Sequence, residues 1–395
     1  TAYEIGVRLV GSEMCIRDRI GIDASRALRA RRTGTENYSL QLIRHLLALD
    51  SGHRFRLYCD QPLPAALQDI GTAGKAEICV IPFPRLWTHL RLSAEVMGNP
   101  PDVLFVPSHV LPLVHPRRSV VTVHDLGYSA FPEAHRRFNR WYLQAGTRFS
   151  ARTAGHVLAD SQATKDDLVR LCGVDPARVT VAYLGRDAAL APITDSVRLT
   201  QVQERLGIAR SGSLRPYVLT VGTLQPRKNL VRLIDAFAQI RPAQTDLCLV
   251  LAGQRGWLSD PIFQRVEELG LQESVLFPGF VSDDDLPALL SGALVFAFPS
   301  LYEGFGFPVL EAQACGTPVL TSTTSSLPEV AGEAALLIDP MSTEAIADGL
   351  HKLLTDSMLR TRLRAAGLAN IQRFSWQRCA VETLQVLEQT AQGDL

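Results

Sequence analysis

The sequence predicts an α/β protein with two doubly wound domains, each a parallel sheet covered by helices. The first observation is that apolar runs of strand length alternate with amphipathic helical patterns in both halves of the chain, as in βαβ units. The second is the length of 395 residues, which is enough for two domains with a full core each. In such sheets ligands bind beyond the carboxyl ends of the strands, so polar residues that follow apolar runs are the functional candidates.

The first half opens with the strand-like run Ile20–Ser25, a glycine-containing loop and an amphipathic helix. Later strand-sized runs are RFRLYC, EICVIP, DVLFVPS, SVVTVHD and HVLADS. The fourth of these ends in His124 and Asp125, where function tends to lie in a parallel sheet. A helix capped by Ser161 and a final strand near Val179–Tyr183 should close this domain.

The sequence therefore predicts a first domain over residues 20–190 and a second over residues 201–373, with a linker at about 187–200. Residues 374–395 are expected to form a last helix.

The second half begins with the strand RPYVLTVG, which ends at Gly222, followed by Thr223 and the basic pair Arg227 and Lys228. Two cations at the carboxyl end of a strand can neutralise a diphosphate, Lys as a point charge and Arg as a fork. The runs TDLCLVLAG and SVLFPGF predict the next strands. Asp283, Asp284 and Asp285 are expected to cap the next helix and to complement its dipole rather than bind a metal.

The segment Tyr302–Val319, YEGFGFPVLEAQACGTPV, is the most informative part of the chain. It follows the apolar run Ala293–Ser300, which has the length of a strand. Gly304 and Gly306 allow a tight turn, and Pro308 suits the first position of a helix. A helix is therefore expected to begin near Pro308, with unpaired amides at its start that can bind an anion.

Two carboxylates lie eight positions apart in this segment, Glu303 in the turn and Glu311 about one turn inside the helix. Carboxylates beside an anion site are better suited to hydroxyl groups of the same ligand, since a carboxylate accepts hydrogen bonds from a vicinal diol. An anion site together with groups that bind ribose and sugar hydroxyls indicates a nucleotide sugar as the ligand.

This segment resembles the E-x7-E signature of retaining glycosyltransferases in the group 1 family, which have the GT-B fold. The resemblance covers nearly the whole chain from Ile20. It implies two Rossmann-like domains that face each other across a cleft, the first on the acceptor side and the second binding the nucleotide sugar. FSWQRCAVETLQVLEQ resembles the family's last helix, which crosses back onto the N-terminal domain.

The resemblance also implies roles for individual residues. Glu311 would bind the ribose diol, Glu303 would reach the transferred sugar, and His124 would lie at the reaction centre with Asp125 orienting it. Gly34 would let a phosphate approach the backbone. The donor-binding set implied by the family is Gly34, Gly222, Thr223, Arg227, Lys228, Gly279, Phe280, Val281, Gly304, Phe305, Gly306, Phe307, Leu310 and Glu311. Within this set Gly279, Phe280 and Val281 are the candidates for the nucleobase. Thr223 stands where the family often has a basic residue.

The PRKN form of the basic loop resembles a mannosyl- and rhamnosyltransferase-like branch. The expected activity is transfer of a hexose, best assigned as mannose from GDP-mannose, to a glycan or lipid-linked acceptor in polysaccharide biosynthesis. The family retains the anomeric configuration by front-face attack, with the departing diphosphate taking the acceptor's proton. It uses no cofactor and no structural metal, and the sequence has no His/Cys cluster with metal-binding spacing.

The charges are unevenly distributed, although the formal net charge is +0. Residues 20–190 contain 21 Lys/Arg against 15 Asp/Glu, and residues 191–395 contain 16 against 22. Basic and aromatic residues are mixed in Arg85–Arg91 and Arg136–Trp141, so peripheral membrane contact and ordinary solvated helices are equally open readings. A nucleic-acid partner is not expected, because the basic excess is small and no nucleic-acid-binding motif occurs.

Scattered cysteines and the lack of a membrane-spanning apolar run predict a soluble cytoplasmic enzyme, and peripheral contact with the inner face of the membrane stays open as an alternative. Residues 1–19 do not fit the family pattern. Written back into codons, they match a common sequencing-library adapter, so we expect a non-native tail. A signal peptide is the competing reading, but the stretch lacks an apolar core.

Two other classes of function remain open. A nucleotide-sugar epimerase or a phosphorylase could share the two-domain plan, because a fold alone does not define a function. A phosphorylase needs a cofactor-bearing lysine late in the chain, and Lys352 is the only lysine after Lys228. An oxidoreductase or a non-catalytic nucleotide binder is disfavoured because neither half has a G-x-G-x-x-G motif followed by an acid.

Overall fold

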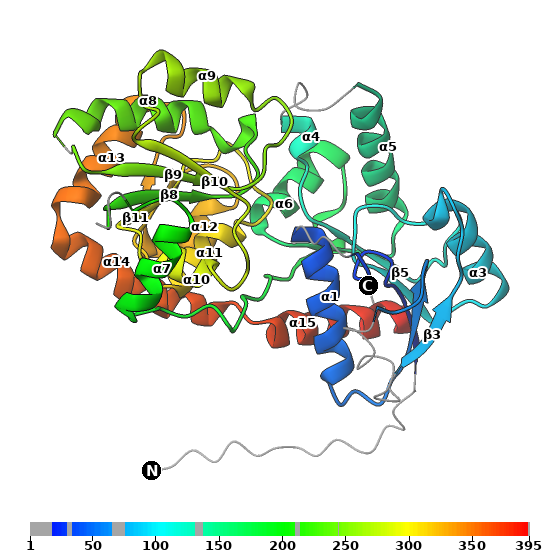
Figure 1. Ribbon diagram of the computed structural model, residues 1–395. Coiled ribbons are helices and arrows are strands. Elements are labelled where there is room, and N and C mark those ends of the chain that lie inside the picture. The colour runs from blue at the N-terminus through cyan, green and yellow to red at the C-terminus, as the bar shows by residue number, and fades with distance from the viewer. Residues whose placement is uncertain are drawn as a thin grey trace, which may run out of the picture.

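The computed structural model describes residues 18–29, 34–64, 76–130, 137–209, 214–243 and 245–393. It contains two parallel β-sheets, each at the centre of its own domain with helices on both faces (Figure 1). The predicted α/β class with two doubly wound domains is therefore confirmed.

The sheet of the first domain has the strand order β3-β2-β1-β4-β5-β6-β7, and every neighbouring pair is parallel. The order reverses between β1 and β4, the place where such sheets bind ligands. The strands are β1 (Arg19–Asp23), β2 (Arg54–Cys59), β3 (Ala76–Val80), β4 (Val103–Val106), β5 (Ser119–Val123), β6 (His156–Ala159) and β7 (Val179–Val181). The helical segments are α1 (Gly34–Ala48), η2 (Thr88–Leu92), α3 (Ser93–Gly98), α4 (Gly127–Ala130), α5 (Arg137–Thr153), α6 (Gln162–Asp167), η4 (Leu168–Cys172) and η5 (Pro176–Arg178).

The sheet of the second domain has the order β10-β9-β8-β11-β12-β13, again entirely parallel, with its reversal between β8 and β11. The strands are β8 (Tyr217–Val221), β9 (Cys248–Ala252), β10 (Val275–Gly279), β11 (Val295–Phe298), β12 (Val319–Ser322) and β13 (Ala335–Ile338). The helical segments are α7 (Ser196–Arg205), η6 (Pro226–Lys228), α8 (Leu230–Ile240), η7 (Arg241–Ala243), α9 (Asp260–Glu268), α10 (Leu286–Ser291), α11 (Phe307–Ala314), α12 (Leu327–Ala331), η8 (Gly332–Ala334), α13 (Thr343–Thr355), α14 (Ser357–Asn370), η9 (Ile371–Arg373) and α15 (Trp376–Gln392).

Two element boundaries differ from the sequence prediction. The first strand begins at Arg19, one residue earlier than expected, and the N–H of Arg19 donates to the carboxylate of Asp102 at 2.7 Å. Residues 1–17 of the expected non-native tail lie outside the described residues. Helix α7 begins at Ser196 inside the expected linker, because the carboxylate of Asp195 caps it by accepting from the N–H of Val197. The helix capped by Ser161 begins as predicted.

The last helix, α15, leaves the second domain and packs against α1 and strands β4, β5 and β6 of the first domain (Figure 1). The connection is close. A Cβ at Gly185 would lie 2.2 Å from the backbone nitrogen of Trp376 at the start of this helix. Glycine at position 185 therefore allows the crossing helix to approach the first domain, and the predicted return of the last helix is confirmed.

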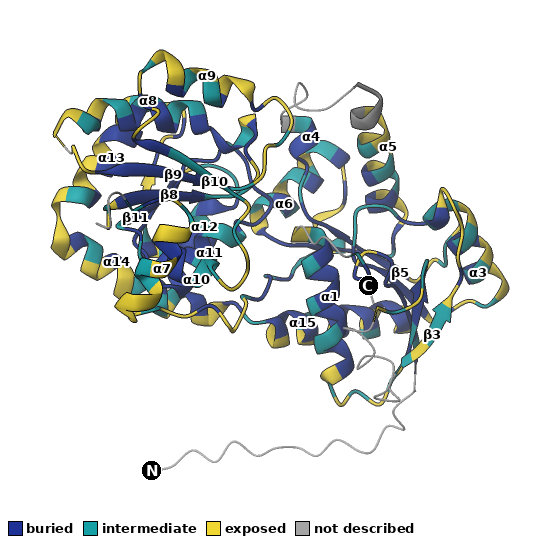
Figure 2. Cartoon of the chain, viewed as in Figure 1, coloured by how far each residue is buried: buried dark blue, intermediate teal, exposed yellow. Residues whose placement is uncertain are grey.

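The central strands of both sheets are buried, the edge strands β3, β10 and β13 are only partly buried, and the outer faces of the helices are exposed (Figure 2). This pattern follows from parallel sheets covered on both faces, which need apolar residues on both sides of each strand. Across the described ranges every helix falls short of the length and apolarity needed to cross a bilayer.

Candidate active site

The turn before α11 lies at the carboxyl end of β11, next to the loop after β12. Helix α11 begins at Phe307, one residue before the predicted position, and Pro308 occupies its first turn. Gly306 has a φ of 117°, a backbone conformation that favours glycine. The N–H of Glu303 donates to the hydroxyl of Ser325 at 3.1 Å, and the hydroxyl of Ser326 donates to the carbonyl of Glu303 at 2.9 Å. These hydrogen bonds fix the backbone of Glu303.

The side chain of Glu303 lies between the two cations that the sequence predicts for the diphosphate. Lys228 Nζ is 2.6 Å from Glu303 Oε1, and Arg227 Nη1 is 2.9 Å from Glu303 Oε2. The hydroxyl of Ser300 donates to Glu303 Oε1 at 2.5 Å. Glu303 and Lys228 are 7% and 8% exposed, so this is a buried cluster of charges. The structure thus joins three of the predicted site residues through ion pairs across 75 or 76 positions of sequence.

Burial and ion pairing shift the pKa of Glu303 in opposite directions. Burial alone would raise the pKa of Glu303, but Lys228 and Arg227 outweigh it and hold the pKa below its usual value. With Glu303 ionised, the charges of Glu303, Lys228 and Arg227 alone sum to one positive charge, and the carboxylate of Asp125 in the first domain also stabilises both cations. Such a cluster is suited to a ligand with several anionic oxygens.

Glu311 lies in the second turn of α11 and is half-buried. Burial raises its pKa to about 7, and the nearby carboxylates of Asp187 and Asp283 add to the shift. A carboxyl group whose pKa is strongly perturbed is a functional candidate.

Gly222, Gly253 and Gly279 adjoin at the carboxyl edge of the second sheet. The N–H of Gly253 donates to the carbonyl of Gly279 at 2.7 Å, and a Cβ on Gly253 would lie 1.9 Å from the carbonyl oxygen of Gly222. A Cβ on Gly222 would lie 3.6 Å from the stem of Lys228. Phe280, the next residue after Gly279, is 68% exposed. The predicted nucleobase and diphosphate loops therefore share one edge of the sheet, and Thr223 lies exposed beside them.

His124 follows β5 and is buried at 8% exposure. Its Nδ1 is 2.7 Å from the Asp160 carboxylate, and its Nε2 is 3.4 Å from the carbonyl of Pro107. Burial disfavours the imidazolium, but Asp160 outweighs this effect and raises the pKa of His124. Both ring nitrogens thus have protein partners in this arrangement, and a sugar hydroxyl would have to displace the longer contact to Pro107.

The expectation that Asp125 orients His124 is wrong, because Asp160 makes that contact. Asp125 instead accepts from the N–H of Gly127 at 2.9 Å. Burial would raise its pKa, but Arg227 of the second domain, together with His109, lowers it. Asp125 therefore faces the charge cluster of the other domain.

The two domains meet closely at this point. The hydroxyl of Ser161 donates to the carbonyl of Gly304 at 2.6 Å, and a Cβ at Gly304 would lie 1.9 Å from the carbonyl oxygen of His124. The hydroxyl of Tyr302 donates to the Asp167 carboxylate at 2.8 Å and accepts from the N–H of Leu126 at 3.1 Å. The turn that carries Glu303 is thus held directly against the loop that carries His124.

The remaining donor-site candidates lie in the same region but are mostly packed against protein. Phe305 is 4% exposed and contacts Phe374 edge-on, and Leu310 is 1% exposed. Phe307 lies near the Trp376 ring, with 6.2 Å between the ring centroids, and a Cβ on Gly34 would lie 4.0 Å from the Phe307 ring. The side chains of Phe305 and Leu310 thus stabilise the turn, while backbone groups of the turn remain the possible ligand contacts.

The prediction that the acids before α10 cap that helix is wrong for Asp285. This residue is at the N-cap position, yet its side chain makes no capping hydrogen bond and pairs with Arg205 at 3.2 Å. Asp283 instead lies near Glu311. In the described part of the chain no group of three or more His, Cys, Asp or Glu residues is arranged to hold a metal ion.

Sequence reasoning missed several residues of this site. Asp160 directly follows the buried strand β6, so the rule that found His124 could also have found it. Ser300 lies three positions before Glu303 and follows β11 in the same way. Gly253 and Ser161 also follow strands, and Ser161 was expected as a helix cap, but the contacts of Gly253, Ser161 and Tyr302 in this site depend on loops or domains distant in sequence.

Two family models match the chain, one in each domain. Glycosyltransferase Family 4 matches residues 32–190, and glycosyl transferases group 1 matches residues 208–369. The O-antigen chain mannosyltransferase B of Escherichia coli is 35% identical over 269 residues, which are 68% of this chain and 69% of that protein. The serotype-specific mannosyltransferase WbdA of Escherichia coli is 30% identical over 250 residues, 62% of this chain but only 29% of WbdA.

The structure of Anabaena Alr3699/HepE in complex with UDP-glucose is similar to this chain, with a TM-score of 0.70 and 21% sequence identity. The match covers 94% of this chain and 99% of the other. At this level of identity the likeness concerns the fold, and it confirms the predicted GT-B architecture.

Proposed function

The chain belongs to the group 1 glycosyltransferase family, and we propose that it is a retaining mannosyltransferase that uses GDP-mannose. The acceptor would be a glycan or a lipid-linked glycan in polysaccharide biosynthesis. The observation that supports mannose is the likeness to O-antigen chain mannosyltransferase B along both this chain and that protein.

In this proposal Arg227 and Lys228 bind the diphosphate of the donor. The two cations would turn from Glu303 toward the phosphate oxygens, and Glu303 would then accept hydrogen bonds from hydroxyls of the transferred sugar. The bond from the sugar carbon C1 to the diphosphate breaks as the acceptor oxygen bonds to C1 from the same face. The departing diphosphate takes the acceptor's proton, so the protein contributes charge stabilisation and positioning.

Glu311 would hold the ribose diol, and Gly279, Phe280 and Val281 would contact the base. The exposed ring of Phe280 is available for stacking on a nucleobase, as in other nucleotide sites. UDP-glucose in the HepE complex supports a nucleotide sugar as the donor class, since the two folds coincide.

The donor nucleotide can be identified from thermal unfolding. GDP at saturating concentration should raise the melting temperature of the chain more than UDP does, because a ligand that binds only the folded state stabilises it. GDP-mannose hydrolysis or transfer, measured by release of GDP, should accompany this shift. A larger shift with UDP, or turnover of UDP-sugars alone, would overturn the GDP-mannose assignment.

The donor affinity should also depend on pH through Glu311. Ribose hydroxyls donate to an ionised carboxylate, and the pKa of about 7 means that this form is lost as the pH falls. Affinity for GDP-mannose should therefore decrease from about pH 8 to about pH 6 by calorimetry, and Glu311→Gln should remove that dependence. The exposed control Glu267→Gln should show the same pH dependence of affinity as wild type. If affinity for GDP-mannose also decreases with falling pH in Glu311→Gln, the ribose role is contradicted.

The raised pKa of Glu311 also makes the stability of the ligand-free protein depend on pH. The pKa of about 7 in the folded chain exceeds the ordinary glutamate pKa of 4.5, so the folded chain binds this proton more tightly than the unfolded chain. The contribution of Glu311 to stability is then highest at low pH and falls as the pH rises to about 7. Glu311→Gln should accordingly raise the Tm of the ligand-free protein near neutral pH.

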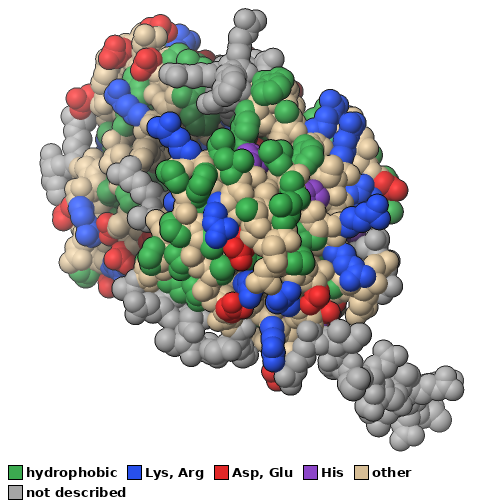
Figure 3. Space-filling view, turned by 90° about the vertical axis from the view of Figure 1, so that its right-hand side faces the viewer, with side chains coloured by type: hydrophobic (Ala, Val, Ile, Leu, Met, Phe, Trp, Pro, Cys, Tyr) green, Lys and Arg blue, Asp and Glu red, His purple; other side chains and the backbone are tan. Residues whose placement is uncertain are grey.

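We also propose that the first domain contacts the inner face of the membrane. Exposed apolar side chains gather around η2, α3 and the start of α5, the side of the first domain seen in Figure 3. Contacts between His89 and Tyr142 at 2.8 Å and between Ser93 and Val114 at 3.2 Å join these segments into one surface. The exposed apolar members are Phe83, Leu86, Leu90, Met97, Leu113, Val114 and Trp141. Exposed Arg85, which lies between Phe83 and Leu86 in the sequence, supplies a charge complementary to anionic lipid.

The chain should sediment with vesicles that contain phosphatidylglycerol. The double variant Leu90→Ser/Trp141→Ser should bind them roughly tenfold more weakly, because it removes apolar area that would enter the interface. The matched control is Met341→Ser/Met358→Ser, two exposed methionines of the second domain. Equal losses in both double variants, or no sedimentation of the wild type, would exclude this surface as a membrane contact.

A further inference from the structure

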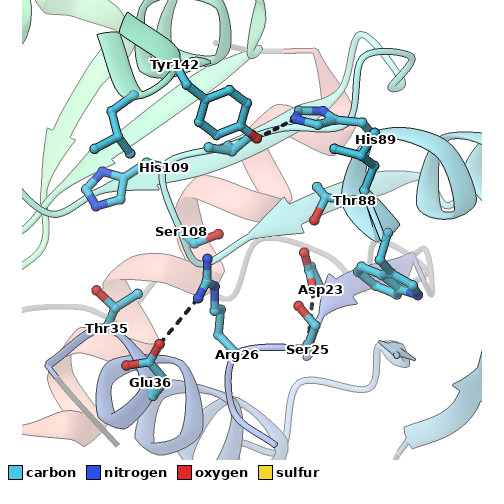
Figure 4. Close-up of a pocket in the computed structure, with 14 residues that line it drawn as sticks. Asp23, Ser25, Arg26, Thr35, Glu36, Thr88, His89, Ser108, His109 and Tyr142 are labelled. Carbon is cyan, nitrogen blue, oxygen red and sulfur yellow. Dashed lines mark hydrogen bonds and ion pairs between the residues drawn. The ribbon is translucent and has the colours of Figure 1, made fainter. Parts of the chain in front are cut away.

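The first domain contains a pocket of about 370 Å³ that none of the predicted site residues line. Its walls come from the loop after β1, the start of α1, the segment around η2, the loop after β4 and α5 (Figure 4). The pocket adjoins the candidate active site in two places. Gly34, next to the pocket residue Thr35, approaches Phe307 of the second domain, and the pocket residue His109 contacts the ring of His124.

The polar groups of the pocket are suited to an uncharged ligand that is rich in hydroxyls. Asp23 is 3% exposed and accepts from the N–H of Ser25 at 2.9 Å. Arg26 reaches the Glu36 carboxylate at 3.5 Å, which leaves the carboxylate of Asp23 as the excess charge among these three groups. An anionic sugar or phosphate would meet like charge here, whereas sugar hydroxyls can donate to the carboxylates. Trp87 and Tyr142 add apolar surface for the face of a sugar ring.

His109 is the unusual member of this pocket. In the described part of the chain neither ring nitrogen has a hydrogen-bond partner, and Nδ1 is buried. Its ring meets the ring of His124 nearly at a right angle, with 5.2 Å between the centroids. Burial lowers the pKa of His109 to about 4, and the neighbouring His124 contributes. The ring is therefore neutral near pH 7, with one nitrogen able to accept and one able to donate.

We propose that this pocket binds the terminal sugar of the acceptor, an uncharged hexopyranose, and that His109 hydrogen-bonds one of its hydroxyls. The inference rests on the proposed glycosyl transfer and names the acceptor side of that site. A buried polar group without a partner is costly unless a ligand satisfies it. His109 is the residue of the pocket in ring contact with His124, whose carbonyl faces the turn that carries Glu303.

The role of His109 in this proposal is to select which hydroxyl reacts. By holding a neighbouring hydroxyl, it turns the reacting oxygen toward C1 of the donor sugar. The reacting hydroxyl stays free to pass its proton to the departing diphosphate as the new bond to C1 forms. His109 itself neither gains nor loses a proton.

The test uses the full chain, methyl α-D-mannopyranoside as acceptor and the set of its monodeoxy analogues. With wild type, two analogues should lose activity: the one that lacks the reacting hydroxyl and the one that lacks the hydroxyl held by His109. The second should lose roughly tenfold in kcat/KM. In His109→Phe, kcat/KM for the parent acceptor should fall by a similar factor. The analogue that lacks the hydroxyl held by His109 should then react no more slowly with this variant than the parent acceptor does. His109→Asn, which keeps a donor and an acceptor, should restore part of the difference.

The matched control is His351→Phe, an exposed histidine of the second domain, which should show the wild-type analogue profile. If the loss of kcat/KM caused by removing a hydroxyl from the acceptor is the same in wild type and in His109→Phe for every analogue, the proposal is overturned. So would a loss of GDP affinity as large as the loss of transfer, because it would show that the variant acts through the donor site. If neither His109 variant folds, Asp23→Asn replaces them, and an unchanged profile there would also overturn it.

A wrong donor assignment can be distinguished from a wrong role for His109. If GDP-mannose is not the substrate, wild type transfers to no acceptor and releases no GDP in water. The analogue series is then run with the nucleotide sugar whose nucleotide stabilises the chain most. An active enzyme with an unchanged analogue profile counts against His109 alone.

Discussion

Replacing Glu303 by glutamine should lower kcat for transfer by roughly a hundredfold while GDP binds at least as tightly as to wild type. Glutamine keeps the shape of the side chain but removes the charge that now pairs with Lys228 and Arg227. Without that competitor both cations are available to the diphosphate, so nucleotide affinity should be maintained or increased. The transferred sugar loses its carboxylate partner, so turnover should fall.

Steady-state transfer kinetics and calorimetric titration with GDP measure the two effects separately. Glu267→Gln on the exposed face of α9 is the matched control and should change neither. If GDP affinity and kcat fall together in Glu303→Gln, the carboxylate supports the phosphate site and does not act on the sugar. Thermal unfolding in the absence of GDP should accompany these measurements, because the variant removes the carboxylate that pairs with buried Lys228 and half-buried Arg227.

Gly304→Ala should reduce transfer strongly while nucleotide binding by the second domain persists. The added Cβ would lie 1.9 Å from the carbonyl oxygen of His124 and 2.8 Å from Cβ of Asp125, so the domains could not keep this contact. Overpacking of this kind costs about 1–3 kcal/mol, which corresponds to a roughly five- to hundredfold loss when it acts on the catalytically competent arrangement.

The control for this variant is Gly98→Ala, because nothing lies within 4 Å of the corresponding Cβ. Small-angle scattering should show a more open domain arrangement in Gly304→Ala and no change in Gly98→Ala. Normal transfer by Gly304→Ala would mean that the contact between His124 and Gly304 is not needed for the reaction.

The elements of the fold could be predicted from the sequence because their signals are local. Alternating apolar and amphipathic segments predict both sheets, and the start of α11 differs from the prediction by a single residue. Ser161 caps α6 as predicted, since a capping side chain bonds an amide only three residues away. Local patterns also place His124, Lys228 and Glu303 near the carboxyl ends of strands, where ligands bind in such sheets.

The partners of these residues were decided only by the tertiary structure. Glu303 meets Lys228 across 75 positions of sequence, and His124 meets Asp160 rather than its neighbour Asp125 across 36. These contacts depend on which strands become neighbours in each sheet and on how the domains close, neither of which a local pattern contains. At Gly304, too, the local sequence predicts the turn but not the tertiary contact. The sequence alone predicts glycine in a turn at this position, but the physical requirement for it is the approach of the backbone to His124 in the other domain.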